Sequence, residues 1–210
     1  MEDRLKEIVN LSYNILVNKV IKGSIEVDNE ASLQLQFAYI LKSVGELFEY
    51  SKDDRFEIEL EKPIKTKTQL VKSKSNNAII DIYMKLCNDN DECICAIELK
   101  RFKKCNNREP NNRYDAFSDI SNLETYKKDN IIHFGYFVLG TDHTHYVTKD
   151  KYSDDTADFD LRDGNVYSAN TLLKYKTNKP YGEDIQLENS YEFKWDKYDT
   201  EEYYFLKLEI

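Results

Sequence analysis

The sequence is poor in residues that break regular structure, and it has no long apolar run. Its 210 residues include only six glycines and three prolines, which argues against a disordered chain. No apolar stretch approaches the roughly 18 residues of a membrane-spanning helix. The N-terminal Met-Glu-Asp-Arg-Leu also lacks the layout of a signal peptide. We therefore expect a cytoplasmic protein that does not contact a membrane.

Cysteine is also scarce, and its spacing does not indicate a metal site. The gaps between the four cysteines do not match the paired Cys-x2-Cys motifs of structural zinc sites. These residues are Cys87, Cys93, Cys95 and Cys105. Cys93 and Cys95 alternate along a strand-like run, where small thiols pack well in a core. We expect both to be buried packing residues, and we expect no disulfides in a cytoplasmic protein.

Aromatic and charged residues are abundant. The chain has sixteen tyrosines and ten phenylalanines, and one third of it is charged, as in folded proteins with strands. Residues 61–76 are expected to form a basic connection or a hairpin. Apolar periodicity predicts helices over 3–20, 28–50 and 113–128, strands over 55–60, 78–86, 93–102 and 131–139, and strand-like runs at 171–175, 190–198 and 203–210.

This order of elements predicts a single α/β domain over residues 1–210. The economical packing is a central mixed sheet of about four strands flanked by helices. The core would span about 28–140, and residues 141–210 would form a β-rich C-terminal extension. The length is sufficient for one full hydrophobic core and hardly for two.

Two neighbouring predicted strands each carry a carboxylate in an otherwise apolar run. Asp81 lies in Ala-Ile-Ile-Asp-Ile-Tyr-Met, and Glu98 and Lys100 lie in Ala-Ile-Glu-Leu-Lys-Arg-Phe. Alternate residues of a strand share a face, so Glu98 and Lys100 are expected to point the same way. Burying unpaired charges is costly, so acids and a lysine in such runs usually pair or hold a metal. Two carboxylates that bind a hard cation beside a lysine form a site suited to phosphodiester hydrolysis.

This pattern resembles the PD-(D/E)XK nuclease superfamily, whose members have the restriction-endonuclease-like fold. In that superfamily one acid lies on the second strand of a meander, and an acid-x-lysine pair lies on the next strand. By resemblance, Asp81 matches the first acid, and Glu98 and Lys100 match the pair. Glu30, in the first turn of the second predicted helix, matches a helical glutamate found in many members. The resemblance covers roughly residues 28–140.

The resemblance implies a role for each of these residues. Asp81, Glu98 and the main-chain carbonyl of Leu99 would bind Mg²⁺, with Mn²⁺ as a substitute, and Glu30 would contact the ion directly or through water. Lys100 would position or help deprotonate the attacking water and stabilise the charge of the phosphorane. The implied function is a Mg²⁺-dependent DNA endonuclease, most like a type II restriction enzyme, that acts on double-stranded DNA as a homodimer.

The charge distribution adds a candidate DNA-binding surface. A net charge of −9 opposes nonspecific binding to nucleic acid. However, residues 62–77 and 99–108 contain lysines and arginines with no acid among them. The residues predicted to contact DNA are Lys65, Lys67, Lys72, Lys74, Arg101, Lys103, Lys104, Arg108 and Arg113. The alternative is that these stretches are solvated lysine-rich loops.

Three further groups have a functional and a structural interpretation. Asn122 and Tyr126 on the third predicted helix could lie near the metal, although packing is the favoured role of Tyr126. His143 and His145 form a His-x-His pair without a third ligand in sequence, which favours an exposed turn over a zinc site. Aromatic residues near the C-terminus could stack on bases, but their alternation is more simply that of sheet packing: Tyr191, Phe193, Trp195, Tyr198, Tyr203, Tyr204 and Phe205.

Other functions stay open at this point. Repair nucleases, resolvases and phage-defence effectors share the same superfamily core. A catalytically inactive binding module would keep the fold without the chemistry, although nothing structural requires all three of Asp81, Glu98 and Lys100. An acidic protein that mimics DNA would explain the net charge but not the two acid-free basic stretches.

Overall fold

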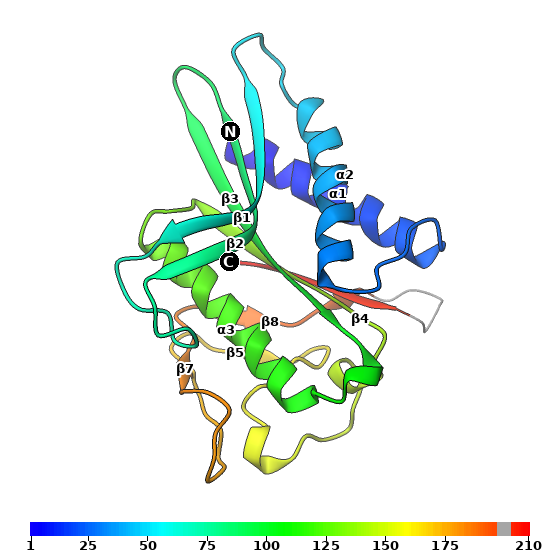
Figure 1. The fold of residues 1–210 in the computed structure, drawn as a ribbon, viewed down its shortest axis with the longest axis vertical. Coiled ribbons are helices and arrows are strands. Elements are labelled where there is room, and N and C mark those ends of the chain that lie inside the picture. Colours follow the sequence, from blue (N-terminus) through cyan, green and yellow to red (C-terminus); the bar gives the residue numbers. More distant parts are fainter. Residues whose placement is uncertain (197–202) are drawn as a thin grey trace.

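A central mixed sheet and three long helices make up most of the protein (Figure 1). The computed structural model describes residues 1–196 and 203–210. The helices are α1 (Glu2–Ile21), α2 (Glu30–Glu46) and α3 (Glu109–Lys128). The sheet order is β1-β2-β3-β4-β10-β9, and its strands are β1 (Arg55–Lys65), β2 (Asn77–Cys87), β3 (Glu92–Phe102), β4 (Phe134–Thr141), β9 (Trp195–Asp196) and β10 (Tyr204–Glu209). β3 and β4 run parallel, and the other neighbours are antiparallel.

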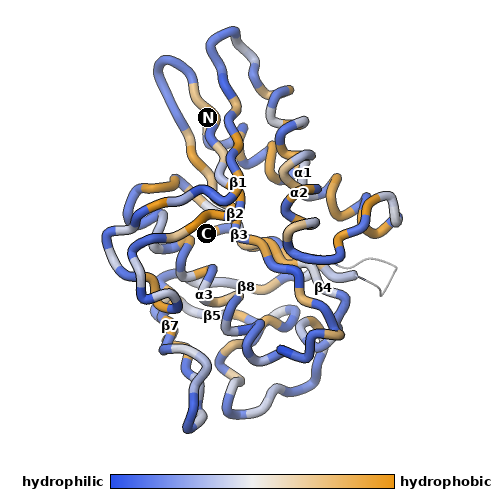
Figure 2. Tube along the Cα trace, viewed as in Figure 1, coloured by the Kyte–Doolittle hydropathy of each residue, from blue (hydrophilic) through white to orange (hydrophobic). Residues whose placement is uncertain are grey.

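The hydrophobic core has one layer on each face of the sheet. α1 and α2 cover one face, where they pack on residues such as Ile97 of β3 and Val138 of β4. α3 and the C-terminal segment cover the other face, where Ala96 and Phe137 point. Consecutive residues thus belong to opposite layers, as the pleat of a strand requires. Figure 2 shows apolar residues along the central strands and mostly polar residues in the loops. In the described residues, no helix has the length and apolar character needed to cross a membrane.

The second helix begins as predicted and ends early. The Asn29 side chain accepts a hydrogen bond from the Ser32 backbone N–H, and the Ser32 hydroxyl accepts one from the Asn29 N–H, which caps α2. The helix ends at Glu46 and not near residue 50. The N–H groups of Leu47 and Phe48, which follow the helix, donate to the carbonyls three residues back, and these bonds tighten the final turn.

The third helix begins earlier than predicted. α3 starts at Glu109, four residues before the predicted start at 113, and Pro110 lies inside its first turn. Proline is favoured there because the first helical N–H groups have no partner within the helix, so the missing donor costs nothing. This early start places the N-terminal end of α3 beside the segment that follows β4, to which Glu109 is bonded through His143.

The first two strands form a longer hairpin than the sequence predicts. β1 continues to Lys65, five residues past the predicted end, and Thr66 and Asn76 close the connection to β2 with a main-chain hydrogen bond. Of the two interpretations of residues 61–76, the hairpin is therefore confirmed. Pairing between β2 and β3 ends at Ile82 and Ile97, and beyond that point the ends of β1 and β2 turn away from β3 (Figure 1).

The C-terminal segment differs most from the prediction. Apart from β10, its described strands have only two residues each: β5 (Val166–Tyr167), β6 (Leu172–Leu173), β7 (Ile185–Gln186), β8 (Tyr191–Glu192) and β9. β10 pairs with the open edge of β4, and β9 pairs with β10, so the sheet has six strands where about four were predicted. β4 also passes through Gly140, the predicted stop, because the Phe205 ring of β10 packs where a Cβ would lie.

Four of the seven aromatic residues that the sequence offers for base stacking are packing residues, and Tyr203 and Tyr204 are half-buried. Tyr191, Phe193, Trp195 and Phe205 are buried, and Phe193 and Phe205 are fully inaccessible. Side chains in these positions have no exposed ring face on which a base could stack. Tyr198 lies outside the described residues.

Candidate active site

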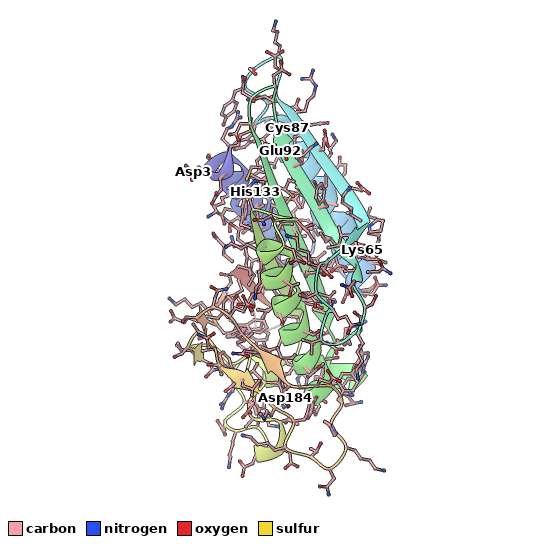
Figure 3. All side chains as sticks on the ribbon, turned by 90° about the vertical axis from the view of Figure 1, so that its left-hand side faces the viewer. Asp3, Lys65, Cys87, Glu92, His133 and Asp184 are labelled. Atoms are coloured by element: carbon pink, nitrogen blue, oxygen red, sulfur yellow. The ribbon has the colours of Figure 1, made fainter. Side chains whose placement is uncertain are left out.

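A cavity of about 940 Å³ opens between the β1–β2 hairpin, β3 and α3. Figure 3 shows α3 running lengthwise beside the strands, with Lys65 on the hairpin side and the tip of the β2–β3 hairpin, marked by Cys87 and Glu92, far from Asp184. The polar side chains that line the cavity come from the β1–β2 hairpin, β3 and α3, which are distant in sequence: Lys65, Lys72, Ser73, Asn77, Asp81, Glu98, Lys100, Ser118, Asp119, Asn122 and Tyr126. Asp81, Glu98 and Lys100, which the sequence singles out, are thus brought to one cavity.

Asp81 lies where β2 separates from β3. If the pairing of β2 with β3 continued, Asp81 would pair with Glu98, but the last pair is Ile82 with Ile97. The Leu99 backbone N–H instead donates to Asp81 Oδ2 at 2.7 Å, and the Asp81 carbonyl accepts from Gln34 Nε2 at 2.8 Å. Where the two strands separate, the Leu99 N–H and the Asp81 carbonyl are free to form these bonds, and main-chain hydrogen bonds therefore fix the position of Asp81.

Glu98 and Lys100 point from β3 toward α3, on the same face as Ala96. Glu98 is 5 % exposed, and its Oε1 is buried without a hydrogen-bond partner. An unpaired buried carboxylate oxygen is costly, so this atom indicates a place where a donor or a cation would be stabilised.

The Lys100 ammonium is held by three acceptors. Its Nζ lies 2.8 Å from the Leu99 carbonyl oxygen, 2.9 Å from Asp119 Oδ2 and 3.3 Å from Glu30 Oε1. A lysine ammonium has three N–H donors, so these contacts use all of them. The Leu99 carbonyl, a metal ligand by resemblance, is in this arrangement bonded to the lysine.

The two acids hold protons more tightly than ordinary carboxyl groups. Burial raises the pKa of Asp81 to about 6, although Lys100 and the Leu99 N–H act in the opposite direction. Burial and the neighbouring Asp81 carboxylate raise the pKa of Glu98 well above its usual value. Burial alone would lower the pKa of Lys100, but the carboxylates of Asp119, Glu30 and Asp81 outweigh it and raise that pKa. At neutral pH the lysine is therefore a cation beside a pair of acids that resist full ionisation.

Glu30 approaches the cluster from the start of α2. Its side chain is 46 % exposed and forms the 3.3 Å ion pair with Lys100. Its negative charge also acts to raise the pKa of Asp81. Glu30 is thus at the rim of the site and in contact with Lys100, which is the approach that the sequence predicts for it.

Sequence reasoning missed two residues of this site and undervalued a third. Asp119 forms the ion pair with Lys100, and Gln34, one helical turn after Glu30, holds the Asp81 carbonyl. Tyr126 is buried, and burial, together with the negative charge of the neighbouring Glu98, raises its pKa. The spacing of Asp115, Asp119, Asn122 and Tyr126 at i, i+4, i+7 and i+11 was the available signal, because it marks one face of a helix.

The donor set fits a hard divalent cation. Asp81 and Glu98 offer carboxylate oxygens on adjacent strands, and Mg²⁺ typically binds one or two carboxylates and keeps several waters. Glu98 Oε1 has no partner, and the pKa values of both acids are raised. Both features are expected of a carboxylate pair whose counter-charge would come from a bound cation. Ligation by the Leu99 carbonyl would require the Lys100 ammonium to leave it.

Two lysines of the predicted DNA-binding set line the same cavity. Lys65 and Lys72 lie on its wall, and Lys72 forms an ion pair with Asp115 at 2.8 Å. Lys67 and Lys74 are exposed on the same connection. On the other predicted stretch, Lys104 and Arg108 are exposed and Lys103 is half-buried.

Arg101 and Arg113 do not belong to that surface. The Arg101 side chain is 2 % exposed and donates to the Val27 and Phe102 carbonyls and to Asp142. Arg113 is likewise buried and donates to Thr156 and Phe159. Both guanidinium groups are used to join segments of the protein interior, so the prediction that they contact phosphates is withdrawn.

Comparisons with known proteins found no match. No protein-family model matches the chain, no curated protein matches it, and no solved structure matches its fold.

Proposed function

We propose that this chain is a Mg²⁺-dependent DNA endonuclease of the restriction-endonuclease-like kind, with Mn²⁺ able to replace Mg²⁺. The observation that carries the proposal is the junction of Asp81 and Glu98 at the split between β2 and β3, beside Lys100 and inside a cavity with lysines on its wall. Structural stability alone does not account for it, because burying two acids whose pKa values are both raised by that burial costs free energy.

In this proposal Asp81 and Glu98 bind the cation, and Tyr126 supports Glu98. A bound Mg²⁺ would supply a positive charge for the scissile phosphate and a lower pKa for a ligated water. Lys65 and Lys72 would hold the flanking phosphates as the strand enters the cavity, since Lys is a strong but geometrically undemanding phosphate partner.

The proposed role of Lys100 is to stabilise charge and not to act as a general base. Its pKa is raised by the surrounding carboxylates, so at neutral pH it has no free electron pair to accept a proton. A fixed ammonium inside a low-dielectric cavity stabilises the negative charge that develops on the phosphorane. Asp119 and Glu30 position that ammonium through their ion pairs.

The deciding experiment is cleavage of plasmid by the pure protein with and without Mg²⁺. We expect cleavage with Mg²⁺ or Mn²⁺, none with EDTA, and none with the Asp81→Asn or Glu98→Gln variant. Lys85→Ala is the matched control, because Lys85 is also on β2 but pairs with Glu57 outside the cavity. No cleavage by the parent protein, or cleavage that survives Asp81→Asn, would overturn the proposal.

Metal binding is measured separately by thermal melting. The parent protein should gain stability with Mg²⁺ as RT ln(1 + [Mg²⁺]/Kd), whereas Asp81→Asn should gain none. A parent that binds Mg²⁺ and DNA without cleaving would instead identify an inactive binding module. The proposed homodimer, which would present two such sites to the two strands of a duplex, is tested by sedimentation with and without DNA.

A further inference from the structure

A second cluster of metal-ligand side chains lies apart from the cavity. Glu109 opens α3, and His143 and His145 flank the start of the short 3-10 helix η2 (Thr144–Tyr146) after β4. One ligand atom from each of these three residues lies within 4.8 Å of the other two. Glu109 is the third ligand that the sequence lacks near the His-x-His pair, and it comes from 34 residues upstream.

The histidines are also not on an exposed turn, as the sequence had favoured. Both are half-buried, and the His145 ring lies against Tyr146 and Tyr152, with centroids 5.3 Å and 5.1 Å away. The His145 Nε2 atom is buried and has no hydrogen-bond partner. A buried ring nitrogen without a partner is unfavourable, and it is the group that a bound cation would satisfy.

The geometry needs only a small adjustment. Tetrahedral zinc with bonds of about 2.0–2.1 Å separates its ligand atoms by roughly 3.4 Å. Glu109 Oε1 and His143 Nε2 are 3.1 Å apart. The other separations are at most 4.8 Å, so the third atom has to close by at most about 1.4 Å, which a rotamer change provides. Coordination through His143 Nε2 places the ring proton on Nδ1, and it gives up the long 3.5 Å contact from the His145 backbone N–H.

We propose that Glu109, His143 and His145 form a Zn²⁺ site with water as the fourth ligand. Two neutral imidazoles and one carboxylate are ligands that zinc accepts. A separate cavity of about 340 Å³, lined by both histidines, Thr148, Lys149 and Asp150, gives the water and the ion access to the site.

This site clamps the start of α3 to the segment that follows β4. Arg101 and Asp142 already join β3 to that segment through an ion pair at 3.1 Å, and the zinc ligands would add a link from α3. Asp119 is ten residues after Glu109 on the same helix, so the zinc lies about 15 Å from the acid cluster and is separate from the Mg²⁺ site.

The test uses the full chain freed of metal with a chelator and then titrated with Zn²⁺ against a chromophoric competitor. We expect one tight equivalent, and we expect Glu109→Gln and His145→Ala to weaken it by about 100-fold or more. Glu109→Gln keeps a hydrogen-bonding side chain beside His143, so it guards against simple loss of folding.

Two controls exclude other ligands. His133→Ala removes the one remaining histidine of the chain, and Cys105→Ser removes the exposed thiol of the nearby loop; both should bind zinc as the parent does. Asp81→Asn should also retain the tight equivalent. Co²⁺ in place of Zn²⁺ should show visible absorption without a thiolate charge-transfer band. If the parent binds no tight equivalent, or if Glu109→Gln and His145→Ala bind as tightly as the parent, the proposal is overturned.

Discussion

At the scale of the residue, the immediate surroundings of a carboxyl group decide whether its pKa is raised or lowered. Asp81 and Asp54 show the two extremes. Burial raises the pKa of Asp81 to about 6, whereas hydrogen bonds from Arg4 and Asn88 hold the pKa of Asp54 well below its ordinary value. Ionisation of Asp81 therefore destabilises the folded protein, whereas ionisation of Asp54 stabilises it. The contribution of Asp81 to stability is present at low pH, and that of Asp54 is present at higher pH.

We predict that Asp81→Asn stabilises the metal-free protein at neutral pH. Because the folded pKa of Asp81 is raised, its contribution to stability is fully present below about pH 4 and is lost as the pH rises through about 6. The shift of about two units corresponds to roughly 3 kcal/mol at most. Urea unfolding from pH 4 to 8 measures it. Asp54→Asn should instead lower the free energy of unfolding at pH 7. If the parent and Asp81→Asn proteins show the same change of stability between pH 4 and 7, the raised pKa of Asp81 is contradicted.

A second prediction at this scale concerns the Lys100 and Asp119 ion pair, whose side chains are 17 % and 14 % exposed. Lys100→Ala leaves several acids without their counter-charge, so we expect it to cost about 3 kcal/mol of unfolding free energy. Adding Asp119→Asn should recover a part of that loss. A double-mutant cycle in the absence of metal gives the coupling directly, and strictly additive effects would show that the pair is not a stabilising contact.

At the scale of the element, the sequence predicted the helices and central strands well, because their apolar periods are regular. It predicted less well where tertiary contacts override local preference. β4 runs through Gly140 because β10 packs against it, and the pairing of β10 with β4 depends on residues more than sixty positions apart. Asp81, Glu98 and Lys100 were recognisable from strand alternation. Helical spacing marked the face of α3 that holds Asp119, but the contacts of Asp119 and Gln34 depend on how α3 and α2 sit on the sheet.

One contact between elements gives a direct test of that packing. A Cβ added at Gly45 of α2 would lie 2.3 Å from the Phe56 ring of β1. Alanine normally stabilises a helix relative to glycine by up to about 1 kcal/mol, but here we expect Gly45→Ala to destabilise the protein by about 1–3 kcal/mol through overpacking. Phe56→Leu in the same background should relieve the clash. Chemical denaturation of the three variants measures it, and a stabilised Gly45→Ala protein would show that α2 and β1 are not in this contact.

At the scale of the whole molecule, an acidic protein places several accessible lysines around one cavity. Lys65 and Lys72 line that cavity, and Lys67 and Lys74 lie on the same connection. Arg101 and Arg113 are also basic, but they are buried and hydrogen-bonded inside the protein. Composition alone does not reveal this difference. The net charge of −9 therefore says little about this face.

We predict that replacing Lys65, Lys67, Lys72 and Lys74 with alanine weakens DNA binding and flattens its dependence on salt. The slope of log K against log salt should fall by about 0.9 for each phosphate that no longer has a lysine partner. Fluorescence anisotropy with a labelled duplex in Ca²⁺ measures both quantities. Replacing Lys85, Lys151 and Lys194, which pair with Glu57, Asp154 and Glu192 elsewhere, is the matched control. An unchanged slope in the first variant would place the DNA-binding residues on another surface.

The split between β2 and β3 has a mechanical consequence. Before Ile82, the N-terminal part of β2 has only β1 as a strand partner, so the hydrogen bonds of the sheet hold it from one side. A two-stranded ribbon is marginal on its own, and Glu61, at the same level, has a left-handed backbone (φ 52°). Under the proposed function, DNA that enters the cavity between the β1–β2 hairpin and α3 would contact the part of β2 that has a single strand partner and holds Asp81. Binding of DNA and placement of the Asp81 carboxylate would then depend on the same segment.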